Sequence, residues 1–187
     1  SLTDDVTGVS LGGFQDIANL GSPGQNGTPL IRLQEGAPIG QILGLVIDAN
    51  QPVNDDGTWN FVDVDGDGVQ DDILDRTIIG NGFPKYNLGL NNTFALGNFD
   101  VNIFVRSVLG HDLINTFRAF YEAPGQISAY NVLNSSLDVA DLTDQPQFSS
   151  RHVESGNFIS LDQMTIGYTL NNDILPNGFR KIRVYAT

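Results

Sequence analysis

The chain has 187 residues, and its 22 acidic and 9 basic side chains give a formal net charge of −13. This balance argues against a nucleic-acid partner, because phosphate binding needs clustered Lys and Arg, and the absence of cysteine excludes disulfides and thiolate chemistry. Charged residues make up only 17% of the sequence and 21 residues are glycine, a composition that favours short strands joined by turns over helices.

The first 48 residues change from polar to apolar along the chain. Residues 1–29 are rich in Gly and Pro, so we expect a turn-rich connection there. The segment Leu30–Asp48 is more apolar and is the first expected strand. Because Pro38 cannot donate a hydrogen bond to a sheet and Gly40 lies close behind it, this strand should contain a kink or a bulge.

The clearest strand pattern is a pair of alternating segments on either side of a short turn. In Tyr86–Leu96 an apolar side chain recurs at every second position, with Asn92 as the one exception. The dipeptide Gly97-Asn98 that follows is a strong hairpin signal. The next segment, Phe99–Arg106, sets Val and Ile against Asp, Asn and Arg. The two segments therefore predict a hairpin of long strands.

Two more alternating segments lie near the end of the chain. They are Phe158–Leu170 and Phe179–Thr187, and the polar stretch Asn171–Gly178 between them is an expected turn. Cations on the polar strand faces, among them Arg106 and Arg183, should pair with nearby acids rather than take part in catalysis. The whole chain is thus expected to contain about five antiparallel strands.

Alternation of this kind occurs in soluble β-sandwiches too, but three features favour a transmembrane barrel. The strands are about ten residues long, enough to cross a membrane at a tilt, and their polar faces suit a wet lumen. Short turns also alternate with long connections, as in outer-membrane barrels. The sequence therefore predicts an all-β fold in which residues 30–187 form part of a transmembrane β-barrel, with extracellular loops at about 49–85 and 111–155.

The first of these loops carries an acidic motif. Residues 48–75 hold nine Asp and no basic residue, and Asp63–Gly68 has the D-x-D-x-D-G spacing that brings alternate carboxylates onto one calcium ion. The twelfth position of such a loop is Leu74 here, so the last acid comes one residue late. The candidate calcium ligands are Asp63, Asp65, Asp67, the Val69 carbonyl, Asp71 and Asp75. The alternative is a solvated acidic turn that Asx hydrogen bonds hold in place.

Catalytic chemistry is not indicated by the sequence. The two histidines, His111 and His152, are expected in loops or at a barrel rim. No Ser lies in a nucleophile elbow and no Gly-rich loop opens a helix, so the protein is not expected to be an enzyme. Aromatic residues in the long loops are candidates for stacking on sugars, although packing inside a loop or against a lid is the commoner use. These residues are Trp59, Phe117, Phe120, Tyr121 and Tyr130.

Several short motifs occur in the order that characterises one known family. They are Gly36–Gly40, Asp63–Asn81 with Pro84–Tyr86, Phe99–Val101 with Gly110–Asn115, Arg151–Ile159, Gly167–Leu170 and Arg180–Tyr185. Together they resemble the SusC/RagA family of TonB-dependent outer-membrane transporters of Bacteroidota. The resemblance covers about residues 30–187, and the chain departs from the family spacing by one extra residue before Asp75.

The resemblance implies the carboxy-terminal part of a large barrel in the outer membrane of a Gram-negative cell. In such transporters a plug domain fills the barrel, a SusD-like lipoprotein caps it, and TonB drives the import of oligosaccharides or peptides. The plug, the TonB box and most strands would lie outside this chain. Two alternatives come from other classes of protein: a soluble secreted calcium-binding β-sandwich for adhesion or glycan binding, and an accessory module of an extracellular hydrolase.

Overall fold

The computed structural model describes residues 13–21, 27–71, 73–171, 175, 178 and 180–187. Within these residues the chain is an all-β protein with ten strands, one short α-helix and three 3-10 helices. None of the described helices is long and apolar enough to cross a membrane. The chain divides into two compact units: unit 1 comprises Ser1–Phe83 and His111–Ser155, and unit 2 comprises Pro84–Gly110 and Gly156–Thr187.

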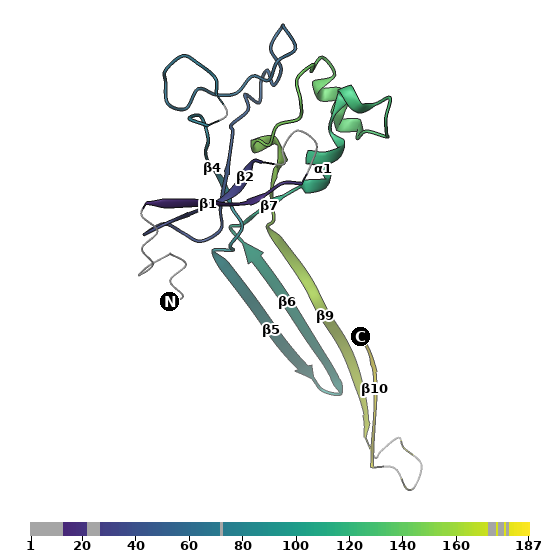
Figure 1. Cartoon of the computed structure of the whole chain (residues 1–187). Coiled ribbons are helices and arrows are strands. Elements are labelled where there is room, and N and C mark those ends of the chain that lie inside the picture. The colour runs from purple at the N-terminus through teal and green to yellow at the C-terminus, as the bar shows by residue number, and fades with distance from the viewer. Residues whose placement is uncertain (1–12, 22–26, 72, 172–174, 176–177, 179) are drawn as a thin grey trace. The chain divides into compact units, whose positions relative to one another are not determined.

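Unit 2 is a four-stranded antiparallel sheet in the order β10-β9-β6-β5 (Figure 1). Its strands are β5 (Tyr86–Leu96), β6 (Phe99–Leu109), β9 (Phe158–Asn171) and β10 (Lys181–Ala186). The structure confirms the hairpin between β5 and β6, whose turn contains Gly97 with a φ of +59°. Glycine suits that turn because side chains with a Cβ rarely adopt a positive φ.

One face of unit 2 is apolar and open to its surroundings. The register sets Leu90 opposite Val105 and Phe94 opposite Val101, so the apolar side chains of neighbouring strands lie on the same side. Leu90, in the middle of β5, keeps 59% of its surface exposed. Other exposed members of this face are Leu88, Phe94, Leu96, Phe99, Leu161, Met164, Ile166 and Val184. This sheet has an apolar surface where a soluble domain would have a buried core.

The opposite face of unit 2 is mostly polar and pairs its charges. Arg106 Nε donates to Asp162 Oδ2 at 2.7 Å, and Arg183 Nε donates to Asp100 Oδ1 at 3.0 Å. The Asn102 amide donates across the hairpin to Asn91 and Thr93, at 3.0 and 2.8 Å. These contacts confirm that Arg106 and Arg183 pair with acids of their own sheet.

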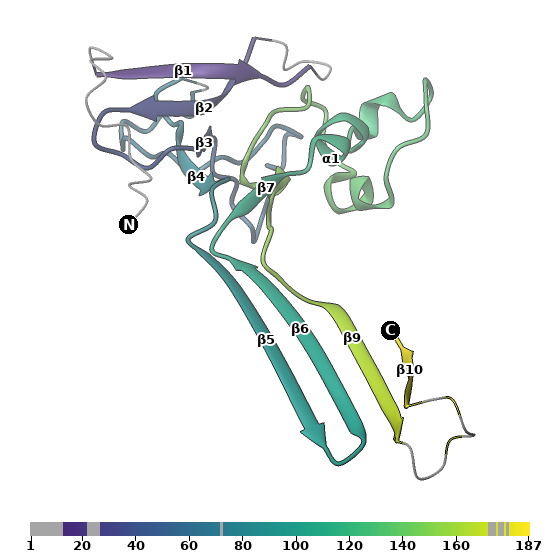
Figure 2. The ribbon, with the colours of Figure 1, turned by 90° about the horizontal axis from the view of Figure 1, so that it is seen from below.

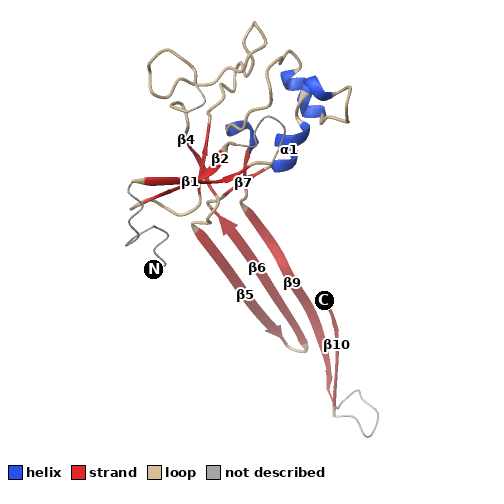
Figure 3. Ribbon diagram, viewed as in Figure 1, coloured by secondary structure: helices blue, strands red, loops and turns tan. Residues whose placement is uncertain are grey.

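Unit 1 is built around a second antiparallel sheet, in the order β1-β2-β3-β4 (Figure 2). Its strands are β1 (Phe14–Asn19), β2 (Pro29–Gln34), β3 (Gln41–Gly44) and β4 (Thr77–Asn81). A two-stranded ribbon pairs β7 (Asp112–Ile114) with β8 (Val153–Ser155). All the described helices lie between β7 and β8 (Figure 3): α1 (Thr116–Tyr121), η1 (Pro124–Gln126), η2 (Asn134–Val139) and η3 (Ser150–His152).

These elements add strands to regions that the sequence did not assign to strands. Residues 1–29, expected to be a connection, contain β1, and the expected first strand Leu30–Asp48 contains the separate strands β2 and β3. β4 lies in the first expected loop and β7 in the second. Each of these strands has only three to six residues, and their sequences show no clear alternation of apolar and polar side chains.

The long connections of unit 1 bury a core of their own in two clusters. The first contains Leu20, Leu30, Ile42, Ala119 and Phe148. The second contains Leu45, Trp59, Phe61, Val139 and Leu142. Trp59 is only 4% exposed and its indole N–H donates to the Gln145 carbonyl at 2.9 Å, so this ring is part of the core and cannot stack on a ligand.

Gly57 joins the two long connections, and its replacement tests their packing. Gly57 and Gly66 have φ of +87° and +80°, but only at Gly57 would a Cβ meet other atoms, 2.7 Å from Thr143 Oγ1 and 3.0 Å from the Asp141 carbonyl. Backbone strain alone costs about 1 kcal/mol. We expect Gly57→Ala to lower the free energy of unfolding by about 2–3 kcal/mol and Gly66→Ala by about 1. Urea denaturation followed by Trp59 fluorescence measures both; equal effects would contradict close packing at Gly57.

Candidate functional site

The acidic loop folds into a tight turn that gathers three carboxylates. One carboxylate oxygen from each of Asp63, Asp65 and Asp67 lies within 4.8 Å of the other two. The two oxygens of Asp63 accept backbone hydrogen bonds from Gly66 and Gly68, at 2.6 and 2.8 Å, and both glycines have a φ near +80°. The loop therefore has the compact geometry that the D-x-D-x-D-G spacing predicts.

The other three candidate ligands play different parts. Asp75 is 1% exposed, and its two oxygens accept from the amides of Val64 (2.7 Å) and Asp71 (2.8 Å), so this carboxylate holds both ends of the loop. These hydrogen bonds, from Asp71 first and Val64 second, hold the pKa of Asp75 below its usual value. The Asp71 carboxylate accepts from the amide of Ile73 at 2.9 Å. Val69 is exposed and donates its amide to Asp67.

The loop brings several negatively charged carboxylates close together, and no basic side chain lies among them. The hydrogen bond from the Asp67 amide lowers the pKa of Asp65, but loss of solvent and the negative charges of Asp67 and two more aspartates outweigh it, so the pKa of Asp65 is raised. A hard cation with oxygen ligands would relieve this repulsion. The donor set of Asp63, Asp65 and Asp67 fits calcium, although the same backbone hydrogen bonds also satisfy the solvated-turn alternative.

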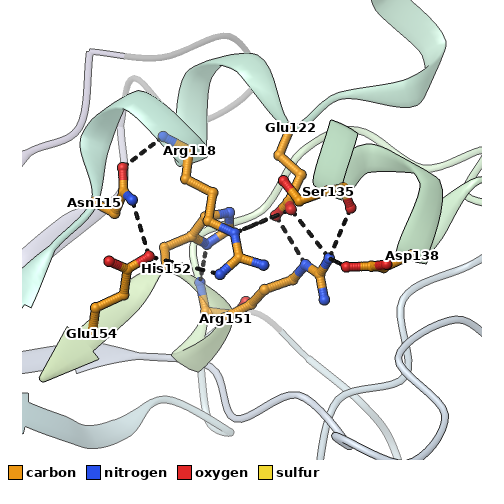
Figure 4. A network of polar contacts seen from close by, with 9 residues as sticks. Asn115, Arg118, Glu122, Ser135, Asp138, Arg151, His152 and Glu154 are labelled. Atoms are coloured by element: carbon orange, nitrogen blue, oxygen red, sulfur yellow. Dashed lines mark hydrogen bonds and ion pairs between the residues drawn. The ribbon is translucent and has the colours of Figure 1, made fainter. Parts of the chain in front are cut away.

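A second cluster of charges is centred on Glu122, at the end of α1 (Figure 4). Glu122 is 3% exposed, and it accepts from Arg118 Nε at 3.1 Å and from Arg151 Nε at 2.9 Å. Arg151 donates further to the Ser135 carbonyl at 3.1 Å. Burial opposes ionisation of Glu122, but the hydrogen bonds from Arg151 and its neighbours outweigh burial, so the pKa of Glu122 is lowered. The cluster joins α1, η2 and η3.

His152 lies beside this cluster, within the connection 111–155 that the sequence predicted as a loop, but it is buried. Its ring stacks on Phe148 with centroids 5.8 Å apart, and its Nδ1 accepts from the Ser149 amide at 3.2 Å. Burial lowers the pKa of His152 from 6.5 to about 4; the charge of Glu122 opposes this effect and those of Arg118 and Arg151 add to it. His152 is therefore a neutral packing residue at pH 7.

The sequence offered one signal for this cluster. The family motif that begins at Arg151 contains Arg151, His152 and Glu154. The partner at Glu122 is 29 residues away along the chain, in a stretch without periodicity, so only the fold brings it to Arg151. The remaining loop aromatics do gather: Phe117, Phe120, Tyr121 and Tyr130 form a contiguous set of ring contacts with centroids 4.5 to 6.0 Å apart.

Comparison with known proteins gives a consistent set of relatives. The chain is 28% identical over 142 residues to the TonB-dependent receptor P3 of Formosa agariphila, and 30% identical over 134 residues to the TonB-dependent receptor P39 of the same organism. These matches cover 72% and 62% of this chain but only 14% and 12% of the relatives. The chain thus spans about one seventh of the length of the curated relatives it matches. No family model matches.

Two solved structures of the RagAB importer have the same fold as this chain. The RagAB peptide transporter superposes on 97% of this chain with a TM-score of 0.74 and 18% identity. The RagAB peptide importer in its closed-closed state superposes on 83% with a TM-score of 0.67 and 21% identity. The matched parts are 21% and 19% of those chains. At such identities the likeness establishes the fold alone: the antiparallel strands of this chain follow those of the matched part of these structures.

The burial of His152 predicts acid sensitivity. The folded chain keeps this ring neutral down to about pH 4, whereas the unfolded chain protonates it near pH 6.5. Stability is therefore complete above pH 6.5 and is lost as the pH falls towards 4, by roughly 3 kcal/mol. Glu122, with its lowered pKa, acts in the same direction at the acidic end of this range.

Denaturation at several pH values measures this slope. We expect His152→Gln to be less stable at pH 7 but to lose the part of the slope between pH 6.5 and 4. His111→Gln, at the other histidine of the chain, should retain the slope. The assignment fails if both variants keep the slope of the unmodified chain.

Proposed function

Since the chain carries a segment of a SusC/RagA-type TonB-dependent receptor, we propose that it forms part of the outer-membrane barrel through which this receptor imports nutrients. The observation that carries the proposal is the two-sided sheet of unit 2. Its long strands expose apolar side chains on one face and paired polar side chains on the other. In a barrel the apolar face would contact lipid and the polar face would line the lumen.

The proposal includes the partners and the placement of the loops. The strands β5 and β6 are joined by a two-residue turn, whereas β6 and β9 are separated by 48 residues, from Gly110 to Asn157. Outer-membrane barrels keep short turns in the periplasm and long loops outside. We therefore place residues 49–85 and 111–155 outside the cell, next to a SusD-like lipoprotein. TonB would contact parts of the receptor beyond this segment and would drive the import of oligosaccharide or peptide cargo.

The soluble sandwich is the less favoured alternative. In a sandwich, Leu88, Leu90, Ile103 and Val105 would be buried against a second sheet. In the described residues Leu88 and Leu90 are more than half exposed, while Ile103 and Val105 are partly exposed. The names of the relatives, receptors and importers rather than enzymes, also fit a protein without catalysis.

Uptake measurements test the import proposal directly. A strain without the gene, grown on single oligosaccharides or on peptides as the carbon source, should lose growth on at least one of them and regain it with the intact gene. Loss of TonB should have the same effect. Normal growth of the deletion strain on every oligosaccharide and peptide mixture that supports its parent would refute the proposal.

The orientation of the sheet gives a matched pair of substitutions. Leu90→Lys places a charge on the face assigned to lipid, where a cation near the bilayer midplane costs about 2–4 kcal/mol. Asn91→Lys places the same charge on the face assigned to the lumen. We expect Leu90→Lys to lower the amount of folded receptor in outer-membrane fractions several-fold and Asn91→Lys to leave it nearly unchanged. Heat-modifiable migration in gel electrophoresis distinguishes folded from unfolded receptor, and the opposite ranking would contradict the assignment.

We also propose that the acidic loop binds calcium. The supporting observation is the convergence of Asp63, Asp65 and Asp67, with Asp75 closing the loop from within. In this geometry the three carboxylates and the Val69 carbonyl would hold the ion. Asp71 and Asp75 lie outside this group of three carboxylates and would act through the loop backbone, from which they accept hydrogen bonds.

Calcium binding has a direct thermodynamic signature. A ligand that binds only the folded state raises the free energy of unfolding by about 2.7 kcal/mol at 100 times its Kd. We expect millimolar calcium to raise the melting temperature, and Asp67→Asn to remove most of that increase. Asp55→Asn, an exposed aspartate outside the three-residue group, is the control. Calorimetry that detects no binding at millimolar calcium would refute the proposal.

A further inference from the structure

Unit 1 contains an open groove of about 470 Å³ between α1 and the end of the sheet where β1 finishes and β2 begins. Its apolar lining consists of Leu20, Leu30, Phe117, Phe120 and Tyr121. Leu20 and Leu30 are buried members of the first core cluster and form the groove floor. This volume lies within the range of small-molecule and side-chain pockets.

The wall of the groove is an exposed aromatic ring held by its neighbours. Phe117 is 61% exposed although it contacts Tyr121, one helical turn further on, with ring centroids 4.5 Å apart. Tyr121 in turn packs against Phe120 and, edge-on, against Tyr130. A large apolar ring that is both exposed and held in place by other rings loses little conformational freedom on binding, which is typical of anchor residues in recognition sites.

The lining restricts what can enter the groove. Its polar side-chain groups are those of Asn19 and Thr116 and the hydroxyl of Tyr121, and it contains no charged side chain. A sugar ring seated between Leu20 and Leu30 would leave several hydroxyls without hydrogen-bond partners, which is unfavourable. A charged group would be desolvated without a counter-ion. The chemistry of the groove therefore favours an uncharged apolar group.

The charge of unit 1 restricts the rest of the ligand. Unit 1 contains nineteen acidic side chains and four arginines, whereas unit 2 contains three acidic and five basic ones. Among these arginines, Arg32 is bonded to Asp16, and Arg118 and Arg151 are bonded to Glu122. The surplus acids attract cations and repel anions over about a Debye length.

We propose that the groove receives an apolar side chain of an extended peptide that carries net positive charge. The apolar side chain would fill the groove against Phe117, and the basic groups would remain in the negative field of unit 1. The inference rests on the proposed import function and narrows its cargo, at this site, from oligosaccharides or peptides to cationic peptides.

The test uses the whole receptor in detergent and three fluorescently labelled octapeptides of Gly and Ser. The first contains one Leu and three Lys, the second replaces Leu by Ala, and the third replaces each Lys by Glu. Fluorescence anisotropy at low salt should show the first binding about tenfold more tightly than either of the others. Its advantage over the glutamate peptide, but not over the alanine peptide, should shrink as salt is raised.

Two variants locate the binding site. Phe117→Ala should weaken binding of the leucine peptide about tenfold, whereas Phe117→Tyr, which keeps the ring, should bind normally. Leu137→Ala, at another exposed apolar side chain of unit 1, is the control and should also bind normally. Equal affinity of Phe117→Ala and the unmodified receptor would overturn the groove assignment.

The remaining outcomes separate this inference from the import proposal. Equal binding of all three peptides, or binding of neutral oligosaccharides that Phe117→Ala weakens, overturns the inference and leaves import intact. If only a partner lipoprotein binds through Phe117, the groove is an interface and the inference is wrong. If the leucine peptide binds as expected but the deletion strain grows normally on all nutrients, the import proposal fails and the groove assignment stands.

Discussion

The alternation of side chains along the strands of unit 2, three of them long, is the constraint on which this unit depends. Each residue of a strand faces the side opposite to its neighbours, so a shift of one residue in pairing would exchange the two faces. The register sets Leu90 opposite Val105 and Asn91 opposite Phe104 over eleven paired residues of β5 and β6. A sheet that keeps its apolar side chains together on an open face has no core of its own. It is suited to a boundary between an apolar and a wet environment, which is the position of a barrel wall.

Unit 1 follows a different constraint, because its long connections must bury their own backbone polar groups. Two small apolar clusters supply the core, and two buried carboxylates order the chain around it. Glu122 accepts from two arginines and so joins three helical segments. Asp75 accepts from two amides and so closes the acidic loop. A buried carboxylate is costly unless it is hydrogen-bonded, so each of these groups selects the one arrangement of its loop that satisfies it.

The sequence predicted unit 2 well and unit 1 poorly, for physical reasons. Long strands with one apolar face repeat their pattern often enough to be recognised, as in β5, β6 and β9. β1, β3 and β7 are short and show no clear repeat, and β3 and β7 also pair with the distant strands β4 and β8. The acidic motif predicted the convergence of three carboxylates because those residues are local. It did not predict the hydrogen bonds that Asp71 and Asp75 accept from the loop backbone, which depend on where the backbone returns.

Unit 1 tolerates its negative charge because its buried and its exposed acids are stabilised in different ways. Its two buried acids each have hydrogen-bond donors, so burial there does not add to the repulsion. The surplus lies on exposed aspartates such as Asp55, Asp141 and Asp144, which water and salt screen. Stability would be served equally well by fewer of them, since net charge destabilises a compact state through self-repulsion. The surplus negative charge, which the fold does not need for stability, is available to select among ligands and favours cationic ones.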